Sequence, residues 1–330
     1  MHPKRNSTLD IFRLIFALGV VFVHLGPNEP NAEWLGKSFN ALSVPFFVIT
    51  ALYFFIRKVL SALEQPGPLC PRLHLDRLWV PYGAWTLIYL GMRVAKHHLQ
   101  GLSFTPDWFR LMAYGGSGVH LHFLPFLLLC QAWTLALILV STRRHRLLAL
   151  TTFGAAFVYD YVGTTQEYFE FGDASQHSLF YVAAAFLLVA VQRSVHLRPL
   201  NFYAGCIIAT IVVITSACDA LPPPLIPFVS PLAGYAATSA ILGLPAITLH
   251  STRLLYILTT TYGIYLMHHA LIESLEVLAH KTGLGLVPYS LGEKLLIVPA
   301  VCVVCIGIIY SLRHSPRLRY LLLGETTAPP

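Results

Sequence analysis

The sequence predicts an all-α integral membrane protein, a bundle of about ten transmembrane helices with both termini cytoplasmic. Three observations support this fold class. Hydrophobic residues make up 56% of the chain and charged residues only 11%, whereas soluble domains carry about 25% charged residues. Apolar runs long enough to cross a bilayer recur along the chain. Basic residues gather between alternate runs, as the positive-inside rule expects.

Each predicted helix is an apolar run of about 20 residues, the length that crosses the hydrocarbon core. The runs are 10–27, 39–56, 79–95, 119–141, 146–163, 178–195, 201–218, 232–249, 254–275 and 291–312. With the N-terminus inside, most of the 22 Lys and Arg residues fall on the cytoplasmic side. We expect one membrane domain over 1–319 and a short, disordered cytoplasmic tail over 320–330. The net charge of +7 is scattered between apolar runs, so it indicates topology and not nucleic-acid binding.

The first predicted helix carries a polar stripe in an otherwise apolar sequence. Arg13 and His24 are separated by three helical turns plus about 20°, so they share a face. Asp10 lies on that face too, because it precedes Arg13 by three residues. Ionisable residues in membrane helices face the bundle interior or a wet cavity. Asp10 and Arg13 can be a simple ion pair and His24 a packing histidine; the alternative is a functional stripe.

The next two predicted helices begin or continue with unusual residues. The second contains Pro45, which predicts a kink or an unsatisfied backbone group. The third follows the run RLHLDRLWVPY, residues 72–82. An ordinary positive-inside loop explains this run. A pocket for a phosphorylated donor explains it as well, since arginine binds phosphate in a bidentate manner.

Two later predicted helices bring ionisable side chains to the outer half of the membrane. The run SGVHLHFLPF begins the fourth helix with His120 and His122. The run TYGIYLMHHALIESLE, residues 261–276, places Tyr265 on one face with His268 or His269. Several ionisable groups at one depth are explained better by a common site than by separate packing.

We predict no metal site and no permanently bound cofactor. A metal could be held by His120, His122 and either His24 or His268, but residues two apart on a helix point about 200° apart. The C-x-x-C at 302–305 lies inside a predicted span, where small packing residues are expected in place of a redox or metal motif.

In these runs the chain resembles the acyltransferase-3 family of integral membrane O-acyltransferases, found mainly in bacteria. The first helix matches its Asp-x-x-Arg start and its Arg-x10-His spacing through Asp10, Arg13 and His24. PFFVITALYF is similar to the family's FFxxSG helix, with Thr50 and Ala51 in place of Ser and Gly. The matches run in order from residue 9 to about 272.

The remaining matches lie at the third, fourth and ninth helices. DRLWVPY resembles the basic start of the family's third helix. HLHFLPFLL resembles HLWFL, with His120 matching and His122 replacing Trp. YGIYLMHHALI resembles Y-x-I-Y-L-x-H, with His268 as the matching histidine. Where the family often has Arg-x-x-Arg, this chain has His74 and Arg77.

The resemblance implies an O-acyltransferase of the bacterial cytoplasmic (inner) membrane. It would transfer an acyl group, commonly acetyl from the co-substrate acetyl-CoA, to a hydroxyl of a cell-envelope or exported polysaccharide or other glycan. The implied partners are acyl-CoA, the acceptor and the lipid bilayer, with no nucleic acid. The competing interpretation is a proton-coupled multi-pass exporter or flippase, in which membrane-embedded ionisable residues are equally expected.

The resemblance also implies roles for single residues. His24 would be catalytic, either as a general base or as a transient acyl carrier, because an imidazole suits both. The acyl donor would be bound by Arg13, Asp10, Arg77 and His74. The acceptor or the oxyanion would be contacted by His120, His122, Tyr265 and His268.

Overall fold

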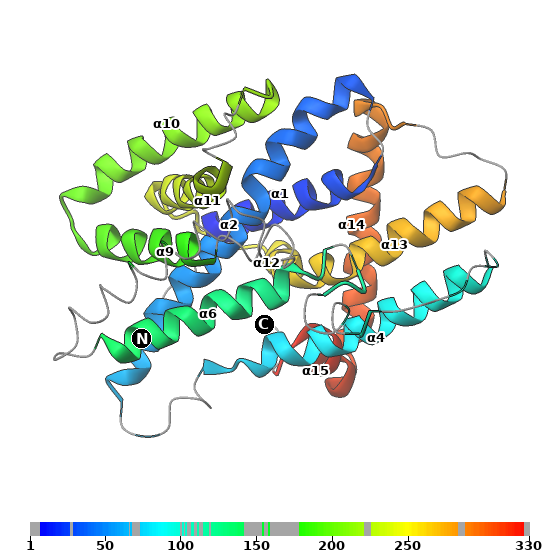
Figure 1. The fold of residues 1–330 in the computed structure, drawn as a ribbon, viewed down its shortest axis with the longest axis horizontal. Coiled ribbons are helices and arrows are strands. Elements are labelled where there is room, and N and C mark those ends of the chain that lie inside the picture. Colours follow the sequence, from blue (N-terminus) through cyan, green and yellow to red (C-terminus); the bar gives the residue numbers. More distant parts are fainter. Residues whose placement is uncertain are drawn as a thin grey trace.

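The structure is a computed structural model in which helices pack into a bundle (Figure 1). It describes residues 7–26, 29–65, 67, 73–99, 101, 103, 107, 108, 111, 115–118, 120–141, 154, 158, 178–220, 226–282 and 288–326. The helices are α1 (Ser7–His24), α2 (Pro30–Leu63), α4 (Asp76–Leu99), α6 (Phe123–Val140), α9 (Ser178–Arg193), α10 (Leu197–Ala217), α11 (Ile226–Gly243), α12 (Thr252–Leu258), α13 (Thr261–Lys281), α14 (Leu291–Arg313) and α15 (Pro316–Leu323). In Figure 1, α10 and α11 lie on one side of the bundle, and α4 and α15 lie on the opposite side.

The all-α fold class is confirmed for the described residues. Five of their helices, α1, α2, α6, α10 and α14, are long and apolar enough to cross a membrane. The apolar helices α9 and α11 are shorter. The predicted helix 146–163 falls almost wholly outside the described residues. The number of ten spans and the cytoplasmic location of both termini therefore stay predictions.

The predicted helix 254–275 is two helices, α12 and α13, and the single-helix prediction is wrong. The break falls at three consecutive threonines. The hydroxyls of Thr259, Thr260 and Thr261 each donate to a backbone carbonyl three residues earlier. Arg313 donates a hydrogen bond to the Thr259 carbonyl, at an Nη2–O distance of 3.1 Å. Side-chain hydrogen bonds of this kind compete with the helical ladder, and a threonine-rich joint results.

The predicted helix 232–249 is also wrong at its C-terminal end, because α11 stops at Gly243. Pro245 has no backbone N–H and disfavours helical geometry in the residue before it. The chain beyond it binds the start of α1. The Thr8 hydroxyl donates to the Pro245 carbonyl (Oγ1–O 2.8 Å) and accepts from the Ile247 amide (N–Oγ1 2.9 Å). These bonds anchor the first turn of α1.

Helix α2 is longer than the predicted run 39–56. It has 34 residues and continues through Pro45, so it measures about 50 Å, well beyond a hydrocarbon core of about 30 Å. Helix α11 approaches it closely at Gly234. A Cβ atom on Gly234 would lie 2.3 Å from the Pro45 carbonyl oxygen. A small residue at such a crossing lets two membrane helices pack backbone to backbone.

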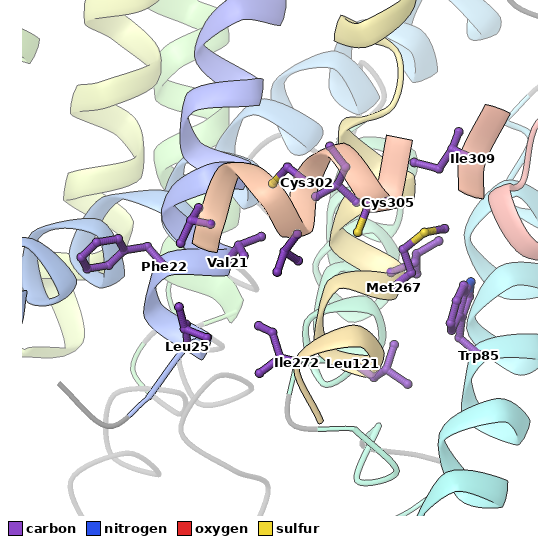
Figure 2. Close-up of a cluster of buried hydrophobic side chains, with 14 of the residues drawn as sticks. Val21, Phe22, Leu25, Trp85, Leu121, Met267, Ile272, Cys302, Cys305 and Ile309 are labelled. Carbon is purple, nitrogen blue, oxygen red and sulfur yellow. The ribbon is translucent and has the colours of Figure 1, made fainter. Parts of the chain in front are cut away.

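An apolar cluster joins α1, α4, α13 and α14 beneath the polar residues of α1. Figure 2 shows Val21 and Phe22 of α1, and Leu25 just after it, in this cluster together with Trp85, Met267 and Ile309. Cys302 and Cys305 of α14 are buried in it as free thiols. They act as small packing residues, which was the prediction for the C-x-x-C.

The C-terminal segment, residues 316–326, packs against the start of α4. The Trp85 indole donates to the Leu322 carbonyl (Nε1–O 2.9 Å). The Tyr320 phenol donates to Asp76 (OH–Oδ2 3.1 Å), and this bond raises the pKa of Tyr320. Arg313 pairs with Glu325 through two nitrogens. Helix α15 extends to Leu323, within the expected tail 320–330. Residues 327–330 lie outside the described part of the chain, so the expected disorder at the end of the tail stays a prediction.

Candidate functional site

His24 is the last residue of α1 and the centre of a group of histidine rings. Its ring centroid lies 5.3 Å from that of His268 and 5.4 Å from that of His269, both on α13. The ring of His120, just before α6, lies 6.1 Å away. Two segments far from α1 in the sequence therefore place imidazoles around His24. We call His24, His120, His268 and His269 the imidazole cluster.

The three partners of His24 are also close to one another and buried. The His120 ring centroid is 4.9 Å from that of His268 and 5.3 Å from that of His269. Their exposed fractions are 2% for His120, 0% for His268 and 9% for His269. His24 is only partly buried. His24 is thus the most exposed ring of the cluster, whereas the other three are buried.

Backbone carbonyls determine which nitrogens of two rings carry a proton. His268 Nδ1 lies 2.8 Å from the Tyr265 carbonyl oxygen and 3.1 Å from that of Ile264. His120 Nε2 lies 3.3 Å from the Leu266 carbonyl oxygen. A carbonyl only accepts hydrogen bonds, so these nitrogens carry the N–H of the neutral ring. The opposite nitrogens, His268 Nε2 and His120 Nδ1, have no hydrogen-bond partner among the described residues. Both are free to accept a hydrogen bond from a bound hydroxyl.

Two tyrosines hold the cluster together. The Tyr265 hydroxyl donates to the His120 carbonyl, which ties α13 to the segment before α6. The Tyr89 hydroxyl on α4 donates to the Leu266 carbonyl (OH–O 2.9 Å) and accepts from the Ala270 amide (N–OH 3.1 Å). Tyr89 thus spans the turn of α13 that carries His268 and His269. Such bonds keep the ring positions rigid, as functional sites generally require.

His269 has a carboxylate beside it. Its Nε2 atom lies 3.5 Å from Glu273 Oε1, one turn further along α13. The Glu273 side chain is 29% exposed, so this pair connects the buried cluster with the surface. The charges of Arg93 and Lys96, at the end of α4, act on the same carboxylate. Neither ring nitrogen of His269 has a hydrogen-bond partner among the described residues, so the contact with Glu273 is an ion-pair distance and not a formed hydrogen bond.

A buried lysine fastens the end of α1 that carries His24. Lys294, in the first turn of α14, is 0% exposed. Its ammonium donates to the Phe22 carbonyl (Nζ–O 3.0 Å) and lies 4.5 Å from the centroid of the Phe22 ring. The last carbonyls of a helix have no partner within the helix and carry its negative dipole end. Lys294 satisfies one of them two residues before His24.

The donor-binding candidates on α1 form the predicted ion pair. Arg13 Nη1 lies 3.2 Å from Asp10 Oδ1, and its side chain is 33% exposed. The guanidinium also lies 5.4 Å from the ring centroid of Phe54 on α2. Eleven residues of helix separate Arg13 from His24, a rise of about 16 Å. The polar stripe therefore has one end in the imidazole cluster and the other at a partly exposed arginine.

The other two donor candidates lie where α4 begins. Arg77 and His74 are exposed, and His74 has a left-handed backbone with φ of 50°. Arg77 donates to the Thr326 hydroxyl of the C-terminal segment (Nη2–Oγ1 2.8 Å). Lys58 of α2 is near enough for the charges of Arg77 and Asp76 to act on it. Arg13 and Arg77 thus have different neighbours, on α2 and on the C-terminal segment respectively.

The structure separates the acceptor candidates. It brings the rings of His120 and His268 to that of His24 and the ring of Tyr265 to that of His120. His122 is exposed just before α6, although it is near enough for its charge to act on His24. The two-residue spacing explains this difference, since the side chains at 120 and 122 leave the chain in different directions. Within the described ranges, no group of three or more His, Cys, Asp or Glu residues is arranged to hold a metal ion.

Sequence reasoning did not assign roles to His269, Glu273, Tyr89 or Lys294. Helical spacing left His268 and His269 as alternatives, and both reach the cluster. Lys294 had a usable signal, because a lysine inside an apolar helix needs a buried partner. No local pattern singles out Tyr89.

The comparisons with known proteins support the family resemblance. The acyltransferase-3 family model, described as an acyltransferase domain, matches residues 6–314. An amino-acid racemase of Enterococcus faecalis is 27% identical over 123 residues, which is 36% of this chain and 17% of that protein. The match is too short to carry an activity from one protein to the other. No solved structure matches the chain. With its apolar helices and a family match over nearly its whole length, the chain belongs to the acyltransferase-3 family of membrane acyltransferases.

Proposed function

We propose that this protein transfers an acyl group, commonly acetyl, from acyl-CoA to a hydroxyl of a cell-envelope or exported glycan in the bacterial cytoplasmic membrane. The observation that carries the proposal is the position of His24. It ends a membrane helix whose same face begins at Arg13, and it meets imidazoles from two other segments. The family match supports acyl transfer as the reaction. The cluster of imidazoles around His24 supports the choice of residues for it.

The donor approaches from the Arg13 end of α1. The CoA phosphates meet basic side chains there, including Arg13 and, from the start of α4, Arg77 with His74. Asp10 orients Arg13 through their ion pair. A pantetheine arm is long enough to cover the rise of about 16 Å to His24. The thioester then lies beside the imidazole cluster while the nucleotide stays at the membrane surface.

The acceptor hydroxyl binds at the opposite side of His24. Either His268 Nε2 or His120 Nδ1 accepts its hydrogen bond; this is supported by the lack of a hydrogen-bond partner for both atoms among the described residues. Tyr265 keeps His120 in position through the backbone bond described above. His122, being exposed, is suited to contact a part of the acceptor that remains outside the cluster. No permanently bound cofactor takes part in this proposal.

The test is acetyl transfer from labelled acetyl-CoA in membranes that contain His24→Ala. We expect transfer to fall by at least about 10²-fold, the usual contribution of a catalytic imidazole. The exposed His314 at the end of α14 gives a matched control, His314→Ala. Near-normal transfer by the His24 variant at equal expression would refute the proposal.

Two measurements test the donor path and the competing exporter interpretation. Arg13→Ala should weaken acetyl-CoA binding more than acceptor binding; unchanged donor affinity would rule out the path. Acetyl-CoA at about 100 times its Kd should stabilise the purified protein by about 2.7 kcal/mol, as any ligand of the folded state does. An exporter with no donor site would show no thermal shift.

A further inference from the structure

We propose that two histidines divide the reaction: His24 carries the acyl group, and His269, held by Glu273, is the base that activates the acceptor hydroxyl. This inference rests on the proposed function and deepens it. It follows from three observations on α1 and α13. The two rings are in contact, a carboxylate adjoins only one of them in the described ion pairs, and that ring lies nearer the partly exposed Glu273.

The Glu273 carboxylate distinguishes His269 from its neighbours. Taking the proton of a hydroxyl turns an imidazole into a cation, which is costly in a buried place without a counter-charge. His120 and His268 are oriented by neutral carbonyls. His269 has the Glu273 carboxylate 3.5 Å from Nε2. When Nε2 carries the proton, as the nearby carboxylate favours, the lone pair of the ring is on Nδ1. A base oriented by a carboxylate is the arrangement that activates hydroxyls in acyl transfer.

His24 is the better acyl carrier because of the helix on which it lies. Helix α1 joins it to Arg13 and so to the donor end, whereas Glu273 joins His269 to the other surface. The ring centroids of His24 and His269 are 5.4 Å apart. A hydroxyl oxygen needs contact distances of about 3 Å to both a base and an acyl carbon, and an oxygen bound at the edge shared by these two touching rings can meet both. The donor and the acceptor then never have to occupy the site together.

The reaction has two steps, acylation of His24 and transfer of the acyl group to the hydroxyl. In the first step, a His24 nitrogen attacks the thioester carbon, the carbon–sulfur bond breaks, and the CoA thiolate takes the proton from the other His24 nitrogen. In the second step, His269 Nδ1 takes the proton of the hydroxyl while the hydroxyl oxygen attacks the acyl carbon. The carbon–nitrogen bond breaks, and His269 returns its proton to His24. The products are an ester and CoA thiol, and both histidines end neutral.

Three assays on the purified full-length protein with acetyl-CoA separate the two steps. Exchange of labelled CoA into acetyl-CoA reports the first step without any acceptor. Hydrolysis of acetyl-CoA reports both steps, with water as the hydroxyl that needs a base. Transfer to hydroxylamine reports an acceptor that is nucleophilic enough to need none. These probes do not depend on knowing the natural acceptor.

We expect His269→Asn to retain exchange and hydroxylamine transfer within about twofold and to lose hydrolysis by about 10²-fold. Glu273→Gln should show the same split at about tenfold. Glu276→Gln, on the same helix, is the matched control and should show no split. His24→Asn should lose all three reactions. The retained reactions show in the same sample that the His269 and Glu273 variants are folded.

Several results would overturn the inference. Loss of exchange together with hydrolysis in the His269 variant would place this residue in the first step or in folding. Wild-type hydrolysis in that variant would remove its role as a base. Absence of exchange in an active wild-type protein would refute the acyl carrier but leave the proposed function intact. Full activity of His24→Asn would instead refute the proposed function itself.

Discussion

The buried polar groups of two regions are organised in opposite ways. Where α2, α10 and α11 pack, Asn201 accepts from the Tyr235 hydroxyl and donates to the Ser239 hydroxyl. The hydroxyls of Thr50 and Thr238 bond to each other at 3.2 Å. Every one of these side chains is at most 8% exposed, and each has a protein partner. This network joins helices, and its side chains form hydrogen bonds with one another.

Around α1 and α13, by contrast, equally buried imidazoles have nitrogens without a hydrogen-bond partner among the described residues. His268 Nε2 and His120 Nδ1 are examples. Buried polar atoms are almost always hydrogen-bonded in folded proteins, so unpartnered ones need an explanation. A bound substrate provides one for the imidazole cluster. We therefore expect the first region to contribute to stability and the second to catalysis. Variants in the two regions can test this division.

The largest effect should come from the cluster. His268→Phe keeps a ring of similar size and removes the free nitrogen. We expect acetyl-CoA hydrolysis to fall by about 10²-fold with little change in the thermal midpoint, because an apolar ring fills the same buried place. Activity assays and thermal unfolding of the same sample measure both. A destabilised but fully active variant would contradict the division between the regions.

Lys294→Met should give the next largest effect. It removes the ammonium that binds the Phe22 carbonyl and frees the end of α1. Because a displacement of about 1 Å at a reacting group can cost about 10²-fold, we expect turnover to fall by about tenfold. The acetyl-CoA affinity should hardly change, since Arg13 lies at the other end of α1. Lys281→Met, at the exposed end of α13, is the control. A loss of affinity with normal turnover would argue against a positioning role.

Asn201→Ala should affect stability alone. It breaks bonds to Tyr235 and Ser239, and hydrogen bonds between membrane helices contribute about 0.6 kcal/mol each, up to about 1.7. We expect the free energy of unfolding to fall by about 1–2 kcal/mol, with unchanged activity per folded molecule. Thr210→Ala, exposed on the same helix, should change neither. If the Asn201 variant lost its activity while folded, the network would have to extend to the site.

Thr50→Val should have the smallest effect and sharpens the comparison most. It removes one bond, to Thr238, and should lower the free energy of unfolding by about 0.6 kcal/mol. Thr50 occupies the serine position of the family's FFxxSG-like run, so a catalytic contribution there would appear as lost hydrolysis. We expect none. If hydrolysis per folded molecule fell, α2 would contribute to catalysis and not only to stability.

The sequence by itself determined the fold class, the polar stripe and most helices. Hydrophobic runs and the helical period are local properties, so Asp10, Arg13 and His24 could be placed on one face before any packing was known. The boundaries failed at Thr259–Thr261 and at Pro245. At Thr259–Thr261 the hydroxyls bond to carbonyls three residues earlier, and Arg313 binds the Thr259 carbonyl. At Pro245 the missing N–H ends the helix, and Thr8 binds the chain beyond it.

Only the tertiary structure decided how the site is assembled. No local pattern predicts that the rings of His120, His268 and His269 meet His24, or that the side chain of His122 is exposed. The helix faces limit which side chains can meet, but contacts between segments more than a hundred residues apart depend on how the whole bundle packs. The same packing determines which imidazole nitrogens have no hydrogen-bond partner among the described residues. It also buries Lys294 against the end of α1. Spacing along a helix is set by the backbone, whereas convergence on one point is set by packing.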